Sequence, residues 1–381
     1  MKKLITIMLA VLFCFAVVSC DGEKKDEKDI VRSIGNYCIT ENGIYYIGSE
    51  SAEKLCFADF ETGYDIILCN KPECMHAEYN VKTNPLPTCD AVTVQGEEYF
   101  GVIVYGDTLY TVEQGTNAYE LYIRKNNLDG SGKKTVATIK GGFSYNGVTP
   151  IICANGYMYY IGYDYSAGMD EGKLDFNRLV ETLYKIELST GKVDLLCRKE
   201  AGKGIYRFVN LYTDGDKLYY LVNDSTTEYD DATSSYQVKD WIFNLYSYDL
   251  QAGTEKRENA DGENKGVVGF SNIHGIITEE YIEGKKVLTN NGKIIYEAND
   301  REMYFVLDDK LIVKNASENM YSIIDIKTAH IEKQFTGGSE IISGASTKYF
   351  VFKNIFNDGF LIVLKDDFYS GNLVWKEFKG T

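Results

Sequence analysis

A strand–turn–strand pattern recurs seven times along this chain, at intervals of roughly 40 to 60 residues. Within each copy apolar and polar residues alternate with a period of two, which is typical of β-strands and not of helices. The turn carries Gly or Asn in every copy except the one at Thr328 and Ala329. The copies are CFADFETGYDIILC (56–69), IRKNNLDGSGKKTVATI (123–139), LYKIELSTGKVDLLC (183–197), LYSYDLQAGTEKRE (245–258), VLTNNGKIIYE (287–297), YSIIDIKTAHIEKQF (321–335) and VLKDDFYSGNLVWKEF (363–378).

A second pattern, a Gly, Asn or Asp turn followed by a Tyr-rich strand, precedes most of these hairpins. Its copies are ENGIYYIG (41–48), YGDTLYTV (105–112), ANGYMYYIG (154–162), DGDKLYYLV (214–222), LDDKLIVKN (307–315) and, more weakly, TKYFVFKN (347–354). Repeats of this length are typical of the four-stranded blades of β-propellers. The sequence therefore predicts an all-β fold, a single β-propeller over residues 35–381 with seven four-stranded blades. Six or eight blades also fit, because strands from both chain ends can share a blade.

One segment has a helix-like pattern, DFNRLVETLYKIEL (175–188). Its second half belongs to the third hairpin and is better interpreted as strand. A helix at 174–180 would be a short surface insertion. The 31 Tyr residues alternate along strands, so we expect them to pack the sheets and not to stack on sugars.

The N-terminus has the pattern of an export signal. Lys2 and Lys3 precede an apolar run from Leu4 to Val18, which is too short to span a bilayer, and small Ser19 follows it. Residues 1–19 are therefore predicted to be a signal peptide, and no later apolar run reaches membrane-spanning length.

The residues at the end of this signal, Val17-Val18-Ser19-Cys20, resemble a bacterial lipobox. In a lipobox the Cys thiol takes a diacylglyceryl group and becomes the first residue of the mature protein. The resemblance implies a lipoprotein anchored at Cys20 by acyl chains such as palmitate, exported and facing outward on the cell membrane. An ordinary secretory signal with an incidental Cys is the alternative.

Charge constrains the partners of the mature chain. Loss of Lys2 and Lys3 leaves 38 basic residues against 56 Asp and Glu, a net charge of −18. Such a surplus repels phosphate backbones and anionic lipid headgroups, so we expect no nucleic-acid partner and attachment through the lipid alone. The run DGEKKDEKD (21–29) has nothing apolar to bury, and residues 20–34 are expected to form the lipidated Cys and a disordered tether.

With these features the chain resembles a broad group of exported bacterial lipoproteins with β-propeller bodies, known largely from anaerobic gut Firmicutes and many of unknown function. One segment carries a more specific resemblance to this group. CNKPECMHAEYNVKTNPLPTC (69–89) looks like a Cys-x-x-Pro-x-Cys-x-His insert that follows the first blade in many such lipoproteins, and we assign the insert to 69–90. The run between His76 and Cys89 is longer here than in that pattern, which leaves the last ligand or disulfide partner open.

The insert has two chemical interpretations. Outside the cytoplasmic membrane paired cysteines tend to oxidise, which favours a Cys74–Cys89 disulfide with Cys56–Cys69 as a second pair across the first hairpin. In that case His76 is a bystander and no metal is bound. The alternative is a zinc site of Cys69, Cys74, His76 and Cys89, because these are tetrahedral zinc ligands. Free thiols are a third outcome, and Cys38, Cys153 and Cys197 are expected to be small core residues.

No catalytic motif stands out. His330 is expected to be solvated and His274 to have a capping or core role, and no Gly-x-Ser-x-Gly elbow, His-Glu-x-x-His, P-loop or dinucleotide fingerprint is present. The acidic loops 164–172 and 223–235 could bind Ca²⁺ but match no EF-hand spacing.

The predicted function follows from this absence of motifs. The leading hypothesis is a non-enzymatic, surface-anchored platform that binds a glycan, a peptide or a partner protein. One alternative is an exported hydrolase or lyase acting on polysaccharide or peptidoglycan, with carboxylates at the central channel. A second alternative is an envelope assembly factor.

Overall fold

The computed structural model describes most of the chain beyond its N-terminal segment. The described ranges are 30–48, 53–93, 97–115, 120–143, 150–164, 169–170, 173–174, 180–200, 208–230, 235–240, 242–260, 265–271, 273–299, 301–353 and 359–378. The predicted signal peptide, Cys20, the charged run 21–29 and most of the possible helix at 174–180 lie outside them. Within these ranges no helix has the length and apolar character that crossing a membrane requires.

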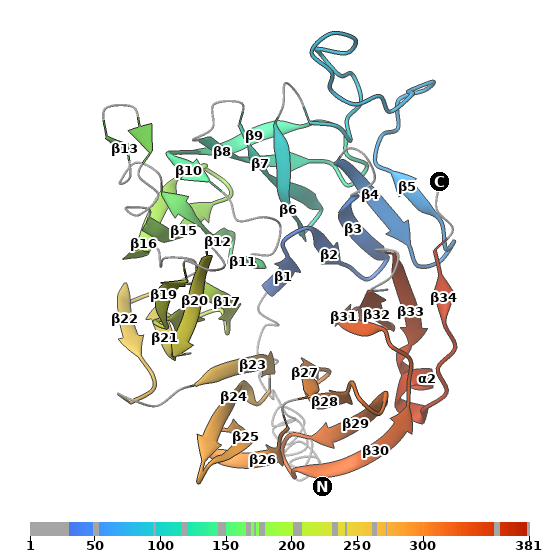
Figure 1. Cartoon of the computed structure of the whole chain (residues 1–381). Coiled ribbons are helices and arrows are strands. Elements are labelled where there is room, and N and C mark those ends of the chain that lie inside the picture. Colours follow the sequence, from blue (N-terminus) through green and yellow to red (C-terminus); the bar gives the residue numbers. More distant parts are fainter. Residues whose placement is uncertain are drawn as a thin grey trace, which may run out of the picture.

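The described strands form antiparallel sheets that follow one another around a ring, so the all-β propeller is confirmed (Figure 1). Five sheets have four strands each, in chain order. They are β6–β9 (Glu98–Tyr105, Thr108–Gln114, Glu120–Asn126, Lys134–Lys140), β17, β18, β21 and β22 (Phe208–Thr213, Lys217–Asn223, Phe243–Asp249, Thr254–Arg257), β23–β26 (Gly266–Ser271, Gly275–Ile282, Lys285–Asn290, Lys293–Glu297), β27–β30 (Glu302–Leu307, Lys310–Asn315, Met320–Asp325, His330–Thr336) and β31–β34 (Ile341–Ala345, Tyr349–Lys353, Phe360–Leu364, Lys376–Glu377).

The other large sheet has ten strands. They are β1 (Ile30–Ile34), β2 (Tyr37–Ile39), β3 (Gly43–Gly48), β4 (Lys54–Asp59), β5 (Asp65–Ile67), β10 (Gly142–Phe143), β11 (Pro150–Ala154), β12 (Tyr157–Asp164), β15 (Val180–Glu187) and β16 (Val193–Glu200). Two small hairpins, β13–β14 (Met169–Asp170, Lys173–Leu174) and β19–β20 (Thr226–Asp230, Ser235–Asp240), complete the described strands.

The expected count of seven separate blades is wrong, because five four-stranded sheets stand alone. β1 pairs with β11 from Ile30↔Ala154 to Ile34↔Pro150 and also touches β2 at Ile34↔Tyr37. The strands of the first and third repeats are thereby joined into one continuous sheet. β1 also occupies the last five residues of the segment that we expected to be a disordered tether.

The seven hairpins read from the sequence all form antiparallel pairs: β4–β5, β8–β9, β15–β16, β21–β22, β25–β26, β29–β30 and β33–β34. The turn without Gly or Asn is stabilised by a local hydrogen bond, because Asp325 Oδ1 accepts the N–H of Thr328 at 2.8 Å. Ala329 in this turn has a φ of 61°.

Gly191 in the β15–β16 turn is constrained both by its backbone conformation and by a close neighbour. Its φ is 74°, and a Cβ there would lie 2.0 Å from the carbonyl oxygen of Val136 on β9. Only glycine lets this turn approach β9 so closely.

The last hairpin departs from prediction in its middle. Residues Lys365–Ser370 form a short helix, α2, between β33 and β34, where the sequence predicted strand and turn alone. Phe368 from this helix is fully buried, with its ring 4.6 Å from that of Phe350 and 5.4 Å from that of Tyr321. Burial of one aromatic side chain therefore accounts for the local helix.

Apolar side chains fill the spaces between neighbouring sheets. Tyr159, Tyr160, Tyr220 and Tyr321 are among the largest fully buried side chains, which confirms that these tyrosines pack sheets. The first and last sheets pack through Ile44, Phe60, Val351 and Ile362, which brings the blue and red ends of the chain together in Figure 1. Among the described strands none from the C-terminal end enters the N-terminal sheet, so the ring closes by side-chain packing.

Candidate functional sites: a Cys/His cluster and a central pocket

The insert after β5 brings together the four residues that the sequence marked as possible zinc ligands. Cys69 follows β5, Cys74 and His76 lie in the next turns, and Cys89 returns toward β6. One ligand atom from each, three Sγ and one imidazole nitrogen, lie within 4.8 Å of one another. Cys89 is buried and the other three are half-buried.

The contacts in this cluster are directed at its sulfur atoms. His76 Nδ1 lies 3.4 Å from Cys89 Sγ. Burial acts to raise the pKa of the Cys69 thiol, but hydrogen bonds from the backbone N–H groups of Lys71 and Asp90 and from the Cys74 and Cys89 thiols together outweigh it, and the pKa is lowered. For Cys89, burial dominates and raises the pKa to about 12. The surroundings of Cys69 thus favour the thiolate form of its side chain.

The expected disulfides are not formed. The seven described cysteines are free thiols, Cys74 and Cys89 among them. Cys56 faces Ile67 across β4 and β5, and its thiol donates to the carbonyl oxygen of Lys54 at 3.5 Å. The predicted Cys56–Cys69 pair therefore has no support in the strand register.

The remaining sequence candidates lie elsewhere. Cys38 and Cys153 are fully buried core residues, as expected, and Cys197 is half-buried with its Sγ 3.5 Å from the hydroxyl of Tyr220. His330 is exposed, as expected, at the start of β30. His274 lies half-buried in the turn before β24, and its backbone N–H donates to Ser271 Oγ at 2.8 Å. The two acidic loops, 164–172 and 223–235, lie partly outside the described residues. Within the described ranges, the Cys/His cluster is the one group whose donor atoms suit a metal ion.

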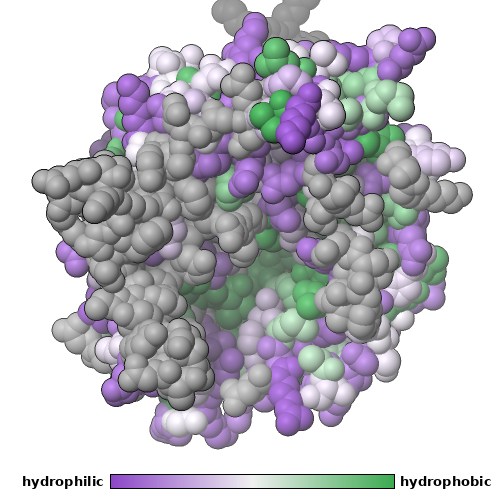
Figure 2. Space-filling model, turned by 45° about the horizontal axis from the view of Figure 1, so that its top comes forward, coloured by the Kyte–Doolittle hydropathy of each residue, from purple (hydrophilic) through white to green (hydrophobic). Residues whose placement is uncertain are grey.

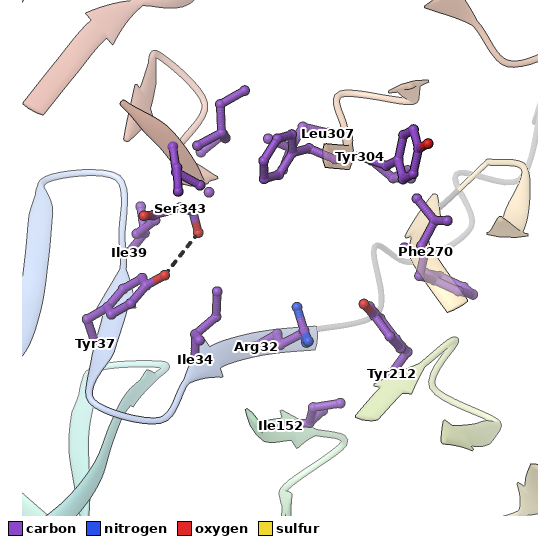
Figure 3. A pocket seen from close by; sticks show the side chains of 18 of the residues that line it. Arg32, Ile34, Tyr37, Ile39, Ile152, Tyr212, Phe270, Tyr304, Leu307 and Ser343 are labelled. Atoms are coloured by element: carbon purple, nitrogen blue, oxygen red, sulfur yellow. Dashed lines mark hydrogen bonds between the residues drawn. The ribbon is translucent and has the colours of Figure 1, made fainter. Parts of the chain in front are cut away.

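A second site, which sequence reasoning missed, is a pocket of about 590 Å³ at the centre of the ring. Its walls are residues of the innermost strands β1, β2, β11, β17, β23, β27 and β31, with Lys353 of β32. Figure 2 shows apolar residues gathered in a hollow of this face, and Figure 3 shows side chains from these strands converging on one space.

Few polar groups enter this apolar pocket. Arg32 of β1 donates from Nε to the carbonyl oxygen of Leu211 at 3.1 Å, and its guanidinium carbon lies 4.4 Å from the centre of the Tyr212 ring. Tyr37 donates from its hydroxyl to the carbonyl oxygen of Ser343 at 3.4 Å (Figure 3), and burial raises the pKa of Tyr37. No Asp, Glu or His is among the described lining residues.

The position of β1 explains why this pocket contains an arginine. Ser33, which points away from the pocket, donates to the carbonyl oxygen of Val102 at 2.5 Å, and Val102 N–H donates to the carbonyl oxygen of Gly35 at 2.9 Å. These bonds seat β1 over β6, so that Ile30, Arg32 and Ile34 replace β6 in the lining. The signal in the sequence is the alternation in IVRSI at 30–34, directly after the charged run.

Comparison with known proteins supports the fold alone. No protein-family model matches the chain, and no curated protein matches it. An oligogalacturonate lyase in complex with manganese has a TM-score of 0.51 at 11% identity, covering 88% of this chain and 89% of that one. The oligogalacturonate lyase of Vibrio parahaemolyticus has a TM-score of 0.52 at 11% identity, covering 89% and 93%. The β-propeller domain of the Trilobed protease from Pyrococcus furiosus has a TM-score of 0.49 at 10% identity, covering 91% and 96%.

Proposed function

We propose that this protein is an exported, lipid-anchored binding protein that holds a small ligand in its central pocket, the ligand having an apolar body and one anionic group. The observation that carries the proposal is the pocket, whose apolar walls surround Arg32 and contain no described carboxylate. A volume of about 590 Å³ falls in the range of small-molecule sites.

Of the two cations in the described lining, Arg32 and Lys353, we assign the selection of charge to Arg32. Its Nε bond to Leu211 and its stacking on Tyr212 fix the guanidinium plane. A guanidinium held in this way offers its terminal N–H groups to a carboxylate or phosphate in a forked geometry. Apolar residues around it lower the local dielectric constant and strengthen that contact.

The same lining disfavours the enzymatic alternative. A glycoside hydrolase of the common type needs a pair of Asp or Glu side chains across its cleft, and the described walls of this pocket offer none. The two oligogalacturonate lyases share only the fold at 11% identity. Incubation with oligogalacturonate and with peptidoglycan fragments, followed by mass spectrometry, tests this alternative, because release of a product would contradict a purely binding role.

Paired probes that differ only in charge test the proposal. Isothermal titration calorimetry compares apolar tripeptides with a free or an amidated C-terminus, and medium-chain fatty acids with their methyl esters. We expect the anionic member of a pair to bind at least about tenfold more tightly, since one charge-assisted contact contributes about 1.5–3 kcal/mol. Arg32→Gln should abolish that preference. Lys192→Ala, which removes an exposed lysine paired with Asp194 at 2.9 Å, is the matched control and should keep it.

Absence of binding by every probe, or a charge preference that survives in Arg32→Gln, would contradict the proposal. If the tripeptides with a free C-terminus bind and the fatty acids do not, the ligand is the end of a peptide, and the opposite result identifies a fatty acid. An envelope assembly role would instead require capture of a folded protein with the pocket variant as active as the wild type.

The anchor is the second part of the proposal. Cys20 and Ile30 are ten residues apart, so a fully extended link spans about 35 Å at most. Lipidation at Cys20 would therefore hold the β1 end of the pocket close to the membrane surface. Cys20→Ser should release the protein into the medium, and an unmodified mass at Cys20 in the membrane-bound wild type would contradict lipidation.

The blade count also enters the proposal. Strands β2–β5, and strands β11, β12, β15 and β16, each follow the four-stranded order of the five separate blades. We propose that the ten-stranded sheet is two such units bridged by β1, so that seven four-stranded units surround the pocket although only five of them stand as separate sheets. A structure of the chain lacking residues 30–34 should then show two separate four-stranded sheets here, whereas a merged or collapsed sheet would contradict this count.

A further inference from the structure

We infer that Cys69, Cys74, His76 and Cys89 bind one zinc ion, which fixes the insert 69–90 onto the adjoining blades. This site is independent of the central pocket and of its ligand. Its first support is geometric, because four ligand atoms from residues spread over 21 positions converge within 4.8 Å of one another.

The distance between His76 and Cys89 matches a tetrahedral ion. Zinc lies about 2.3 Å from thiolate sulfur and about 2.0–2.1 Å from imidazole nitrogen, so a sulfur and a nitrogen on one ion lie about 3.6 Å apart. His76 Nδ1 and Cys89 Sγ are 3.4 Å apart. A disulfide would use two of the three thiols and leave a third thiol and an imidazole beside it without a role.

The donor set selects the metal. Three thiolates and one imidazole are soft or borderline ligands that suit zinc, whereas manganese, calcium and magnesium prefer oxygen. All four positions are filled by the protein, which is the pattern of a structural site and not of a catalytic one. Binding forms three Zn–S bonds and one Zn–N bond, and the thiol protons leave to solvent.

The surroundings supply what three thiolates on one divalent ion require. Backbone N–H groups of Lys71 and Asp90 point at Cys69, and that of Ala91 points at Cys89. The Lys71 ammonium is held beside the cluster by Asp90, at 2.7 Å, and by the carbonyl oxygen of Thr88. It offsets the net negative charge of a zinc ion with three thiolates, as an outer shell of hydrogen bonds and charges does in metal sites.

The insert has little regular secondary structure, and several of its large apolar side chains are exposed. Its only described bridge joins Asn80 and Asn84, and Met75 and Val81 are 88% and 70% exposed. The backbone at Glu73 and His76 is left-handed, with φ of 56° and 49°, which costs free energy in non-glycine residues. Those two turns aim Cys74 and His76 at the cluster, so metal bonds account for a conformation that apolar burial does not.

The ion would connect two blades. Cys69, Cys74 and Cys89 pack with Leu55 and Tyr99 from the first and second repeats. Next to Cys69, Asn70 donates to Asp129 of the β8–β9 turn at 2.6 Å. Fixing the insert at the cluster therefore also fixes the contact between these neighbouring sheets.

Metal analysis of the full-length chain tests the inference. After dialysis against metal-free buffer, inductively coupled plasma mass spectrometry should find one zinc ion per chain. Cobalt(II) added to the metal-free protein should give the strong visible bands and the sulfur-to-metal charge-transfer band of tetrahedral thiolate coordination. The cobalt spectrum uses the wild-type chain, so it decides the matter even if a variant fails to fold.

Variants assign the ligands. His76→Ala should weaken zinc retention at least about tenfold in competition with a chromophoric chelator. The controls His330→Ala, at an exposed histidine, and Cys197→Ser, at a half-buried cysteine, should retain zinc as the wild type does. Chelation should accelerate tryptic cleavage after exposed Lys82 in the insert.

Three outcomes would overturn the inference. One is metal-free protein in which intact mass and peptide mapping show a Cys74–Cys89 bridge. Another is three alkylatable thiols with no cobalt bands and no affinity for zinc. The third is iron or another metal at one equivalent in place of zinc.

Discussion

Lys376 donates a hydrogen bond from Nζ to the backbone carbonyl oxygen of Phe60 at 2.6 Å, although 316 residues separate the two. Lys376 begins the last strand, β34, and Phe60 directly follows β4. The Phe60 ring is 2% exposed and lies 5.2 Å from the ring of Tyr349 and 6.2 Å from that of Phe378. One residue of the first hairpin thus carries both polar and apolar contacts to the last sheet.

Phe60→Ala should open this junction. Removing a buried phenylalanine costs about 3–5 kcal/mol of unfolding free energy, because transfer and cavity terms add. Urea unfolding followed by tryptophan fluorescence measures the loss. Tyr64→Ala, in the same hairpin but 56% exposed, is the control and should cost under about 1 kcal/mol. Equal losses in the two variants would mean that the ring does not depend on this contact.

Much of this architecture was predictable from local sequence. The seven hairpins are encoded by alternation and by turn residues within 11 to 17 positions, so their existence needs no long-range information. The joining of two repeats by β1 was not predictable in the same way. Its partner β11 lies about 120 residues away, and nothing in the segment IVRSI indicates which strand it pairs with.

The two candidate sites differ for the same reason. Cys69, Cys74 and His76 are close in sequence, so their grouping could be predicted, whereas the choice between disulfide and metal needed the position of His76 against Cys89. The pocket is assembled from the inner strands of six repeats and from β1, which lies over the inner strand β6 of the second repeat. Arg32 becomes a pocket residue only because β1 displaces β6, a consequence of tertiary packing that residue types alone do not specify.

Glu113 is the centre of a buried charge cluster, and its removal should be costly. It is fully buried on β7, accepts from Thr111 Oγ1 at 2.6 Å and lies 3.5 Å from Arg124 and from Lys133. Glu113→Ala takes one carboxylate away from two half-buried cations, of which Arg124 keeps Glu97 at 2.7 Å, and should cost about 3 kcal/mol. The control Glu297→Ala breaks an exposed pair with Lys285 and should cost under about 1 kcal/mol. Chemical denaturation of the two variants compares them, and similar costs would contradict the role of Glu113.

Lys314 should make stability depend on alkaline pH. It is 1% exposed, donates to the carbonyl oxygen of Glu340 and lies over the Tyr321 ring, and burial lowers its pKa. Between that lowered pKa and the unfolded value of about 10.4 the unfolded chain binds more protons, so the unfolding free energy rises with pH. Below the lowered pKa the buried charge costs free energy.

Lys314→Met removes this dependence. At neutral pH the variant should be as stable as the wild type or more stable, because methionine fills a similar volume without a charge to desolvate. The difference between the two proteins should shrink or reverse as pH approaches about 10. Urea unfolding at a series of pH values provides the measurement, and a constant difference across the series would show that Lys314 does not titrate as proposed.

Filling the central pocket should remove ligand binding without unfolding the protein. Ser343 lines the pocket at a β-bulge between Ile342 and Gly344, so it has no directly opposite residue in the β31–β32 pairing. Ser343→Trp puts a large ring into the space that the ligand would occupy, and we expect affinity for the best anionic probe to fall more than about tenfold. Val374→Trp, at a 57% exposed position that is not among the described lining residues, is the size-matched control. The melting temperature of each variant verifies folding, and calorimetry gives the affinity. Full binding by a folded Ser343→Trp protein would place the ligand away from the β31 side of the pocket, since the tryptophan ring takes up space that a ligand contacting this wall would need.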